Sequence, residues 1–255
     1  MVVGLDRFQE HFADFTEGYV LIGGAACFLN MSDNDLDFRA TQDLDIVLCL
    51  EAMDDDFVEA FWQFVRDGAY RNLELAKDER KFYRFDKPET AGYPKMLELL
   101  SREPDQFTIP DGVHLTPIPA GEDIPSLSAI LMDEEYYEFL QAGKRTIDGV
   151  QVAGPEHLVP LKVRAWLDLS ERRAADVSSV RSTDVKKHKL DVFRLMAIVD
   201  PDFGGECPQR VKDDITDFID KMADETIDMR AVGLRGQSQE AILALIAQIY
   251  LGQGE

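Results

Sequence analysis

The alternation of apolar and polar residues divides the chain into a first part with short strands and a second part made of helices. Short apolar runs bounded by turn residues predict strands at 19–22, 43–50, 81–86, 95–100, 113–118 and 127–132. Helical periodicity predicts helices near 5–16, 25–30, 55–67 and 134–142. We therefore expect an α/β or α+β fold in which a mixed sheet is flanked by helices.

The second part begins at Gly154-Pro155, because proline is favourable in the first turn of a helix. Helical periodicity then predicts helices near 156–170, 183–199, 208–223 and 238–251. The sequence thus predicts a core domain over residues 1–153 and a helical C-terminal domain over residues 154–255.

The sequence of the first part predicts two β-hairpins. The strands at 81–86 and 95–100 flank a connection that contains proline and glycine, so we expect them to pair. The segment 146–152 carries Asp148-Gly149 between two short apolar runs, which is a strong signal for a two-residue hairpin turn.

Two carboxylates lie two residues apart at the start of the second predicted strand. Side chains two apart in a strand project from the same face, so Asp43 and Asp45 point the same way. Leu44 and Ile46 form the opposite, apolar face. Like charges this close repel unless a cation lies between them, and Mg²⁺ prefers carboxylate and phosphate oxygens. The pair therefore predicts a magnesium site, with two metal ions as the expected arrangement.

A diglycine, Gly23-Gly24, directly follows the first predicted strand and precedes a predicted helix. Glycine allows a backbone turn to approach a triphosphate closely, and the N–H groups at a helix start favour anions. Alone, a diglycine is usually a turn, and Asp-x-Asp a solvated loop or a helix cap. The order strand, diglycine, helix, then Arg39-x-Thr41-x-Asp43-x-Asp45 favours a phosphate and metal site.

This set of motifs resembles the nucleotidyltransferase superfamily that includes DNA polymerase beta, and within it the AbiEii/AbiGii-type toxins. The resemblance covers most of residues 15–200, with an acidic insertion at 32–37 and a long polar run at 170–183. It implies a nucleotidyltransferase-type sheet with Mg²⁺ as cofactor and an NTP as substrate. The implied catalytic residues are Asp43, Asp45, Glu98, Lys162 and Asp191; the metal ligands are Asp43, Asp45 and Glu98; and the nucleotide-binding residues are Gly23, Gly24, Arg39 and Thr41.

The residues that only the resemblance implicates also have ordinary interpretations. Glu98 is the single acid inside an apolar run, which is costly unless it is paired or bound to metal, but an exposed edge strand would also tolerate it. Lys162 would neutralise triphosphate charge, or would be a surface lysine. Asp191 would serve the site, or would form a weak surface ion pair with Lys187 on a solvated helix face.

Composition describes an ordinary globular chain. It has 255 residues, of which 45% are hydrophobic, and it carries neither a signal-peptide pattern nor a membrane-length apolar run. Cys27, Cys49 and Cys207 are scattered, which predicts neither a disulfide framework nor a zinc site. We therefore expect a cytoplasmic protein that does not contact membranes.

The net charge of −22 argues against extensive DNA binding, because proteins that grip nucleic acid normally present basic surfaces. Six basic residues nevertheless gather in one stretch and would either receive an RNA end or form a solvated surface: Arg172, Arg173, Arg181, Lys186, Lys187 and Lys189. The overall acidity also suits a basic partner protein. In the toxins that this chain resembles, such a partner would be an antitoxin.

The sequence thus predicts a Mg²⁺-dependent enzyme that moves a nucleoside monophosphate from an NTP to an acceptor hydroxyl. The resemblance implies a tRNA end or a protein as acceptor, in a toxin–antitoxin or phage-defence system. Two alternatives stay open: an antibiotic-type enzyme that modifies a small molecule, and a catalytically idle scaffold that binds nucleotides or partners. The acceptor, the base and the oligomeric state are not specified by any residue pattern.

Overall fold

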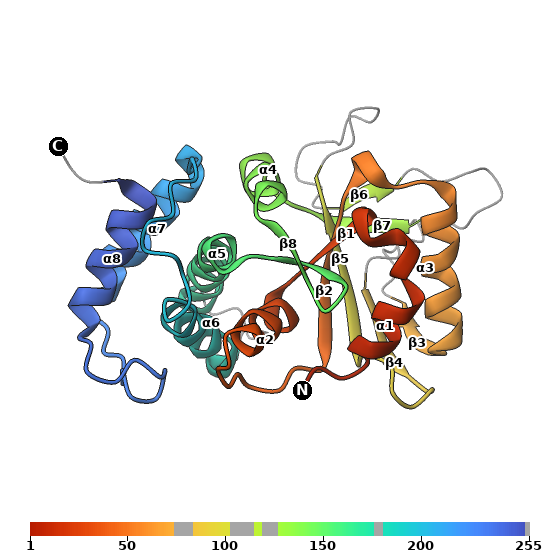
Figure 1. The fold of residues 1–255 in the computed structure, drawn as a ribbon, viewed down its shortest axis with the longest axis horizontal. Helices are drawn as coiled ribbons and strands as arrows, with labels where there is room; N and C mark the ends of the chain where they lie inside the picture. The colour runs from red at the N-terminus through yellow and green to blue at the C-terminus, as the bar shows by residue number, and fades with distance from the viewer. Residues whose placement is uncertain (74–83, 103–114, 119–126, 176–180, 253–255) are drawn as a thin grey trace. The chain divides into compact units, whose positions relative to one another are not determined.

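The structure is a computed structural model that describes residues 1–73, 84–102, 115–118, 127–175 and 181–252. The chain forms two compact units (Figure 1). The first comprises Met1–Tyr137 and Lys144–Ala153, and the second comprises Glu138–Gly143 and Gly154–Glu255. Helix α4 (Glu134–Ala142) begins in the first unit and ends in the second.

The first unit is built on one mixed sheet. Its order is β3-β4-β5-β2-β1-β9-β8, and β7 pairs with both β5 and β6. The pairs β1–β9, β2–β5 and β5–β7 are parallel, and the other pairs are antiparallel. The strands are β1 (Tyr19–Ile22), β2 (Asp43–Leu48), β3 (Tyr70–Leu73), β4 (Arg84–Pro88), β5 (Met96–Ser101), β6 (Leu115–Ile118), β7 (Leu127–Leu131), β8 (Lys144–Ile147) and β9 (Val150–Ala153). This sheet, with helices packed on it, confirms the predicted fold class.

One face of the sheet is covered by α1 (Leu5–His11) and α3 (Asp55–Asp67), which lie on the same side of the strands in Figure 1. The ring of Phe8 lies 5.0 Å from that of Tyr19, and the ring of Phe61 lies 5.5 Å from that of Phe85. Phe12, fully buried, contacts several of these rings. Truncating such a ring to alanine typically costs about 3–5 kcal/mol, so this aromatic layer is a main source of the unit's stability.

Helix α3 shows how the sequence produces this layer. Asp54 caps the helix, since its carboxylate accepts a hydrogen bond of 2.9 Å from the backbone N–H of Phe57. Phe57, Phe61 and Phe64 then recur at helical spacing and are all buried. The apolar stripe therefore faces the sheet, while the charged residues of the helix face outward.

Several element ends differ from the predictions. The helix expected at 5–16 ends at His11 and continues as a short 3-10 helix (Ala13–Gly18), because the chain leaves the α conformation at the buried Phe12. β2 ends at Leu48 and not at residue 50, and β3 was not predicted. The predicted strands at 81–86 and 113–118 extend over residues 81–83 and 113–114, which lie outside the described residues.

Both predicted hairpins are confirmed. β4 and β5 pair in antiparallel register, with Arg84 opposite Glu98. β8 and β9 pair around Asp148 and Gly149, whose φ angles are 49° and 76°. Positive φ at both central positions is the geometry that the Asp-Gly dipeptide predicts.

The second unit is helical, as predicted. Its helices are α5 (Pro155–Ala174), α6 (Ser182–Leu195), α7 (Gln209–Met222) and α8 (Gln239–Leu251), with α6 ending four residues before the predicted end at 199. Trp166 of α5 packs edge-on against Phe218 of α7 at 5.3 Å. None of the described helices has both the length and the apolar character needed to cross a bilayer.

His157, near the start of α5, is a buried titratable group in this unit. It is 7% exposed and lies between the rings of Phe139, at 4.4 Å, and Phe203, at 5.4 Å. Its Nδ1 atom has no hydrogen-bond partner among the described residues. Burial lowers the pKa of this imidazole, an effect that the nearby Glu156 carboxylate opposes.

We predict that this site makes the protein less stable in mild acid. Because the pKa of His157 is lower in the folded than in the unfolded chain, the unfolded state takes up the proton first as the pH falls. The contribution of the neutral His157 to the free energy of unfolding is therefore complete above the pKa of histidine in the unfolded chain, about 6.5, and is lost as the pH falls below that value. Urea unfolding at pH 7.5 and 5.5 should show a smaller loss of unfolding free energy for His157→Leu than for wild type; an equal loss in both would contradict the prediction.

Candidate active site

The register of β2 and β5 places the three predicted carboxylates on one face of the sheet. The strands are parallel, with Asp43 opposite Met96 and Asp45 opposite Glu98. Paired positions project from the same face, so Glu98 lies beside Asp45, and Asp43 is two residues along β2. All three acids are partly exposed, whereas Leu44 on the other face is fully buried. The acids thus lie on the face opposite the aromatic layer.

Gly23 lies directly against Asp45. It follows β1, whose last residue Ile22 pairs with Asp45, and it is the first residue of α2 (Gly23–Asp33). Its φ of 65° is one that L side chains rarely adopt, and a Cβ atom there would overlap Oδ2 of Asp45. Glycine is therefore required here both by the backbone and by the approach of the carboxylate.

Gly24 brings the other predicted nucleotide-binding residues to the same place. A Cβ atom on Gly24 would lie 2.8 Å from Oγ1 of Thr41 and 3.7 Å from a terminal guanidinium nitrogen of Arg39. The segment around Thr41 is fixed by a hydrogen bond of 3.1 Å from the N–H of Val3 to the carbonyl of Thr41. The start of α2 therefore has a guanidinium, a hydroxyl and a carboxylate around two glycines.

The start of α2 is also suited to an anion. The N-cap residue is Ile22, which has no polar side chain to satisfy the N–H groups of the first turn, and this turn contains no acidic residue. Such N–H groups and the positive end of the helix dipole favour phosphate oxygens. This agrees with the role that the sequence predicts for Gly23 and Gly24.

Arg84 is a residue of this face that the sequence reasoning missed. It lies opposite Glu98 on β4, and its Nε donates a hydrogen bond of 2.8 Å to Oε1 of Glu98. Asp86 follows on the same face, and its Oδ1 is buried without a hydrogen-bond partner in the described part of the chain. The signal was present, since Arg84 and Asp86 alternate around the buried Phe85 in a strand already expected to pair with β5.

The residue types and the register fit a hard divalent cation such as Mg²⁺. All three candidate ligands are carboxylates on one face, which is the ligand type that Mg²⁺ prefers. Among the residues that the structure describes, however, no three His, Cys, Asp or Glu side chains are grouped closely enough to hold a metal ion. Arg84 contacts Oε1 of Glu98, so a metal at this carboxylate would compete with Arg84 for its negative charge.

Lys162 and Asp191 lie together in the second unit. Nζ of Lys162, on α5, is 3.8 Å from Oδ2 of Asp191, on α6, and Arg194 donates a hydrogen bond of 3.0 Å to Oδ1. The side chain of Lys162 is 5% exposed and that of Asp191 is 0% exposed. This corrects the surface interpretations of both residues: they form a buried ion pair, and removing one partner would leave the other charge uncompensated.

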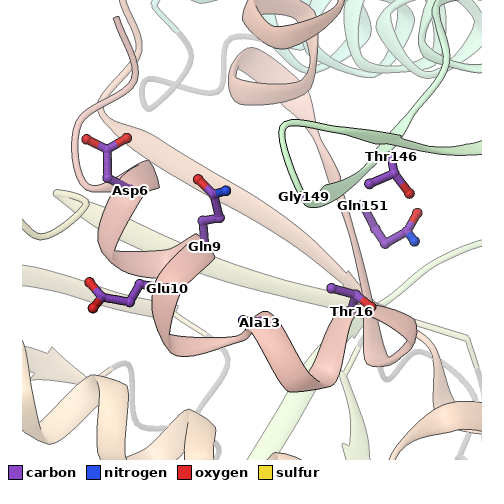
Figure 2. Close-up of a pocket in the computed structure, with 8 residues that line it drawn as sticks. All are labelled: Asp6, Gln9, Glu10, Ala13, Thr16, Thr146, Gly149 and Gln151. Atoms are coloured by element: carbon purple, nitrogen blue, oxygen red, sulfur yellow. The ribbon is translucent and has the colours of Figure 1, made fainter.

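A cavity elsewhere in the first unit contains none of the predicted site residues. It has a volume of about 580 Å³ and lies between α1, the 3-10 helix that follows it and the β8–β9 hairpin (Figure 2). Asp6, Gln9 and Glu10 line it. The side chain of Gln9 connects α1 to the β8–β9 hairpin by donating a hydrogen bond of 2.5 Å to the carbonyl of Asp148. The candidate site is therefore defined by sheet register and glycine contacts and not by this cavity.

Comparisons with known proteins give only distant likenesses. No protein-family model matches the sequence, and a search of curated proteins finds no match. Among solved structures, the chain is similar to an antigenic nucleotidyltransferase-like protein from Paracoccidioides brasiliensis, with a TM-score of 0.46 and 14% identity over 94% of each chain. It is also similar to the Megavirus polyadenylate synthase, with a TM-score of 0.39 and 11% identity over 87% of this chain and 36% of the other. A third likeness is to JHP933 from Helicobacter pylori, with a TM-score of 0.35 and 14% identity over 97% of this chain and 89% of the other. At these values the likenesses carry no argument about activity.

We predict that Gly23→Ala costs more stability than backbone strain alone explains. Gly233 is the matched control, since its φ is 87° and a Cβ atom there would meet nothing within 4 Å. Gly233→Ala should cost about 1 kcal/mol of unfolding free energy, from the positive φ. Gly23→Ala should cost more than about 3 kcal/mol, because Asp45 must also move. Equal losses in urea unfolding would show that Gly23 and Asp45 are not in contact.

Proposed function

We propose that this chain is a Mg²⁺-dependent nucleotidyltransferase that moves a nucleoside monophosphate from an NTP to an acceptor hydroxyl. The observation that carries the proposal is the contact of Gly23 with Asp45, which joins the phosphate-binding start of α2 to the carboxylate face. The pairing of Ile22 with Asp45 in neighbouring strands brings the two together. A turn that binds phosphate and acids that would hold Mg²⁺ would need to be adjacent, because the ion, when bound, would neutralise triphosphate charge.

Each residue has a distinct role in this proposal. Gly23 and Gly24 allow the backbone to approach the triphosphate, while Arg39 and Thr41 orient it. Asp43, Asp45 and Glu98 would hold Mg²⁺, which when bound neutralises the triphosphate and lowers the pKa of the acceptor hydroxyl. The acceptor oxygen then bonds to the α-phosphorus, the bond to pyrophosphate breaks, and the hydroxyl proton is released.

By the resemblance, Lys162 and Asp191 would be further catalytic residues. Within the second unit, Asp191 fixes the position of Lys162 through the contact of 3.8 Å. The second contact of Asp191, with Arg194, holds the carboxylate from the other side.

The physiological part of the proposal follows from the resemblance to the AbiEii/AbiGii-type toxins. The acceptor would be a tRNA end or a protein, and the effect would be growth arrest in a toxin–antitoxin or phage-defence system. The net charge of −22 supports a basic antitoxin as partner through electrostatic attraction. The reaction would take place in the cytoplasm.

A second candidate is a catalytically idle scaffold that binds nucleotides or a partner. The pairing of Arg84 with Glu98 favours it, because an internal cation takes a carboxylate that an active site needs for metal. Nucleotide binding without transfer would identify this case. An antibiotic-type enzyme would instead label a small molecule.

We predict that Asp45→Asn abolishes transfer. The test incubates the protein with Mg²⁺ and each α-³²P-labelled NTP in total tRNA plus cell lysate and measures labelled RNA and protein. Loss of one carboxylate charge at the metal should lower labelling by at least about 10²–10³-fold. Asp56→Asn, an exposed acid of α3 that removes the same charge, should have no effect. Labelling that survives Asp45→Asn would rule out this carboxylate face as the site.

We also predict that Arg84→Gln lowers the Mg²⁺ concentration needed for half-maximal labelling. Arg84 and a metal compete for Glu98, and this partly exposed ion pair is worth about 1 kcal/mol or less, so the shift should reach up to about fivefold. Arg71→Gln is the control, because Arg71 forms an exposed ion pair with Glu89. A higher Mg²⁺ requirement for Arg84→Gln would show that Arg84 assists the reaction and does not compete with the metal.

A further inference from the structure

The second unit contains a groove that no step of the proposed function uses. It has a volume of about 760 Å³ and is lined by the C-terminal part of α5, one face of α6 and the connection between α7 and α8. This volume is in the range of sites that hold small organic ligands. Arg173, Lys186 and Lys189 line it, in a protein whose net charge is −22.

Two of these cations form no ion pair within the described part of the chain. Lys189 forms an ion pair of 2.6 Å with Glu225, which also lines the groove, as does Asp228. Neither Arg173 nor Lys186 forms an ion pair with any described residue. The groove thus holds two positive side chains, one from each of two helices, that pair with no carboxylate of the described residues.

Uncharged donors accompany these cations. Oγ of Ser170 is buried, lines the groove and has no hydrogen-bond partner among the residues described. A buried hydroxyl without a partner costs free energy, which a ligand oxygen would recover. Ser182, the first residue of the 14-residue α6, also lines the groove, and the N-cap residue Arg181 makes no side-chain cap. The first N–H groups of α6 therefore favour an anion, although Asp184 in the same turn weakens the effect.

The groove also has an apolar part. Val185 and Leu190 line it on the same face of α6 as Lys186. A ligand that combines an anionic group with a planar or apolar group would therefore contact both parts. Phosphate matches guanidinium, ammonium, hydroxyl and helix N–H donors together, since each can donate to a different phosphate oxygen.

We propose that this groove binds a nucleoside phosphate ester, either as a free nucleotide or as the end of an RNA. Arg173 and Lys186 contact the phosphate, Ser170 donates a further hydrogen bond, and the base rests on Val185 and Leu190. The proposal does not rest on the carboxylate site of the first unit, and its test requires neither Mg²⁺ nor catalysis.

The test measures binding of a fluorescein-labelled single-stranded RNA of about eight nucleotides by fluorescence anisotropy in EDTA, with AMP and inorganic phosphate as competitors. The double variant Arg173→Gln/Lys186→Gln should bind at least roughly tenfold more weakly than wild type, because it loses two charged donors. The matched control is Arg172→Gln/Lys187→Gln, which changes the neighbouring residues of the same helices. It removes the same charge outside the groove lining and should weaken binding by less than about threefold.

Further arms separate the possible ligands. Displacement of the RNA by AMP would show that a free nucleotide is sufficient, whereas binding of RNA that AMP does not displace would assign the groove to an RNA end. Ser170→Ala should weaken either interaction by roughly threefold to tenfold, from the loss of one hydrogen bond. Equal losses of RNA affinity in the two double variants would show that general charge attraction, and not the groove, binds the RNA, and would overturn the proposal. Absence of binding to RNA and AMP in wild type would also overturn it.

Discussion

Repulsion among like charges on one face of neighbouring strands is the constraint on which the first unit depends. Asp43, Asp45 and Glu98 share that face, and the repulsion between their negative charges raises the free energy of the folded state. The aromatic layer on the other face supplies the compensating stability, with fully buried rings such as Phe12 and Phe61 packed on fully buried strand residues. The two faces of β2 thus differ in what they contribute. Leu44 and Ile46 are fully buried and stabilise the strand by apolar packing, whereas Asp43 and Asp45 carry negative charge that a cation or a hydrogen-bond donor offsets.

The internal cation Arg84 changes how this face should be understood. Its ion pair with Glu98 relieves part of the repulsion within the chain itself. The face is therefore compatible with a folded protein in the absence of metal, and a metal at Glu98 would compete with Arg84. Lys162 is likewise paired within the chain, since its ammonium lies 3.8 Å from the buried carboxylate of Asp191, which Arg194 also contacts.

Local patterns in the sequence were sufficient for the features that depend on neighbouring residues. The period of two in β2 placed Asp43 and Asp45 on one face, and Asp148-Gly149 gave the hairpin turn. Individual side-chain contacts between paired segments were not predicted. The contact of Arg84 with Glu98 requires the register of β4 on β5, and the burial of Lys162 requires the packing of α6 on α5. The short β3 was missed because Tyr70-Arg71-Asn72-Leu73 has two adjacent polar residues, so it is neither an apolar run like β1 nor an alternating pattern.

The parallel pairing of β2 with β5 has a consequence for how the protein is made. A parallel pair needs a crossover, and here α3, β3 and β4 lie between Asp45 and Glu98 along the chain. Non-local pairing of this kind forms late, because loop closure must precede it. During synthesis, the diglycine and the residues of β2 are translated before the residues of β5. The carboxylate face is therefore assembled only after the middle of the sheet has been translated, so a chain interrupted before residue 98 lacks this face.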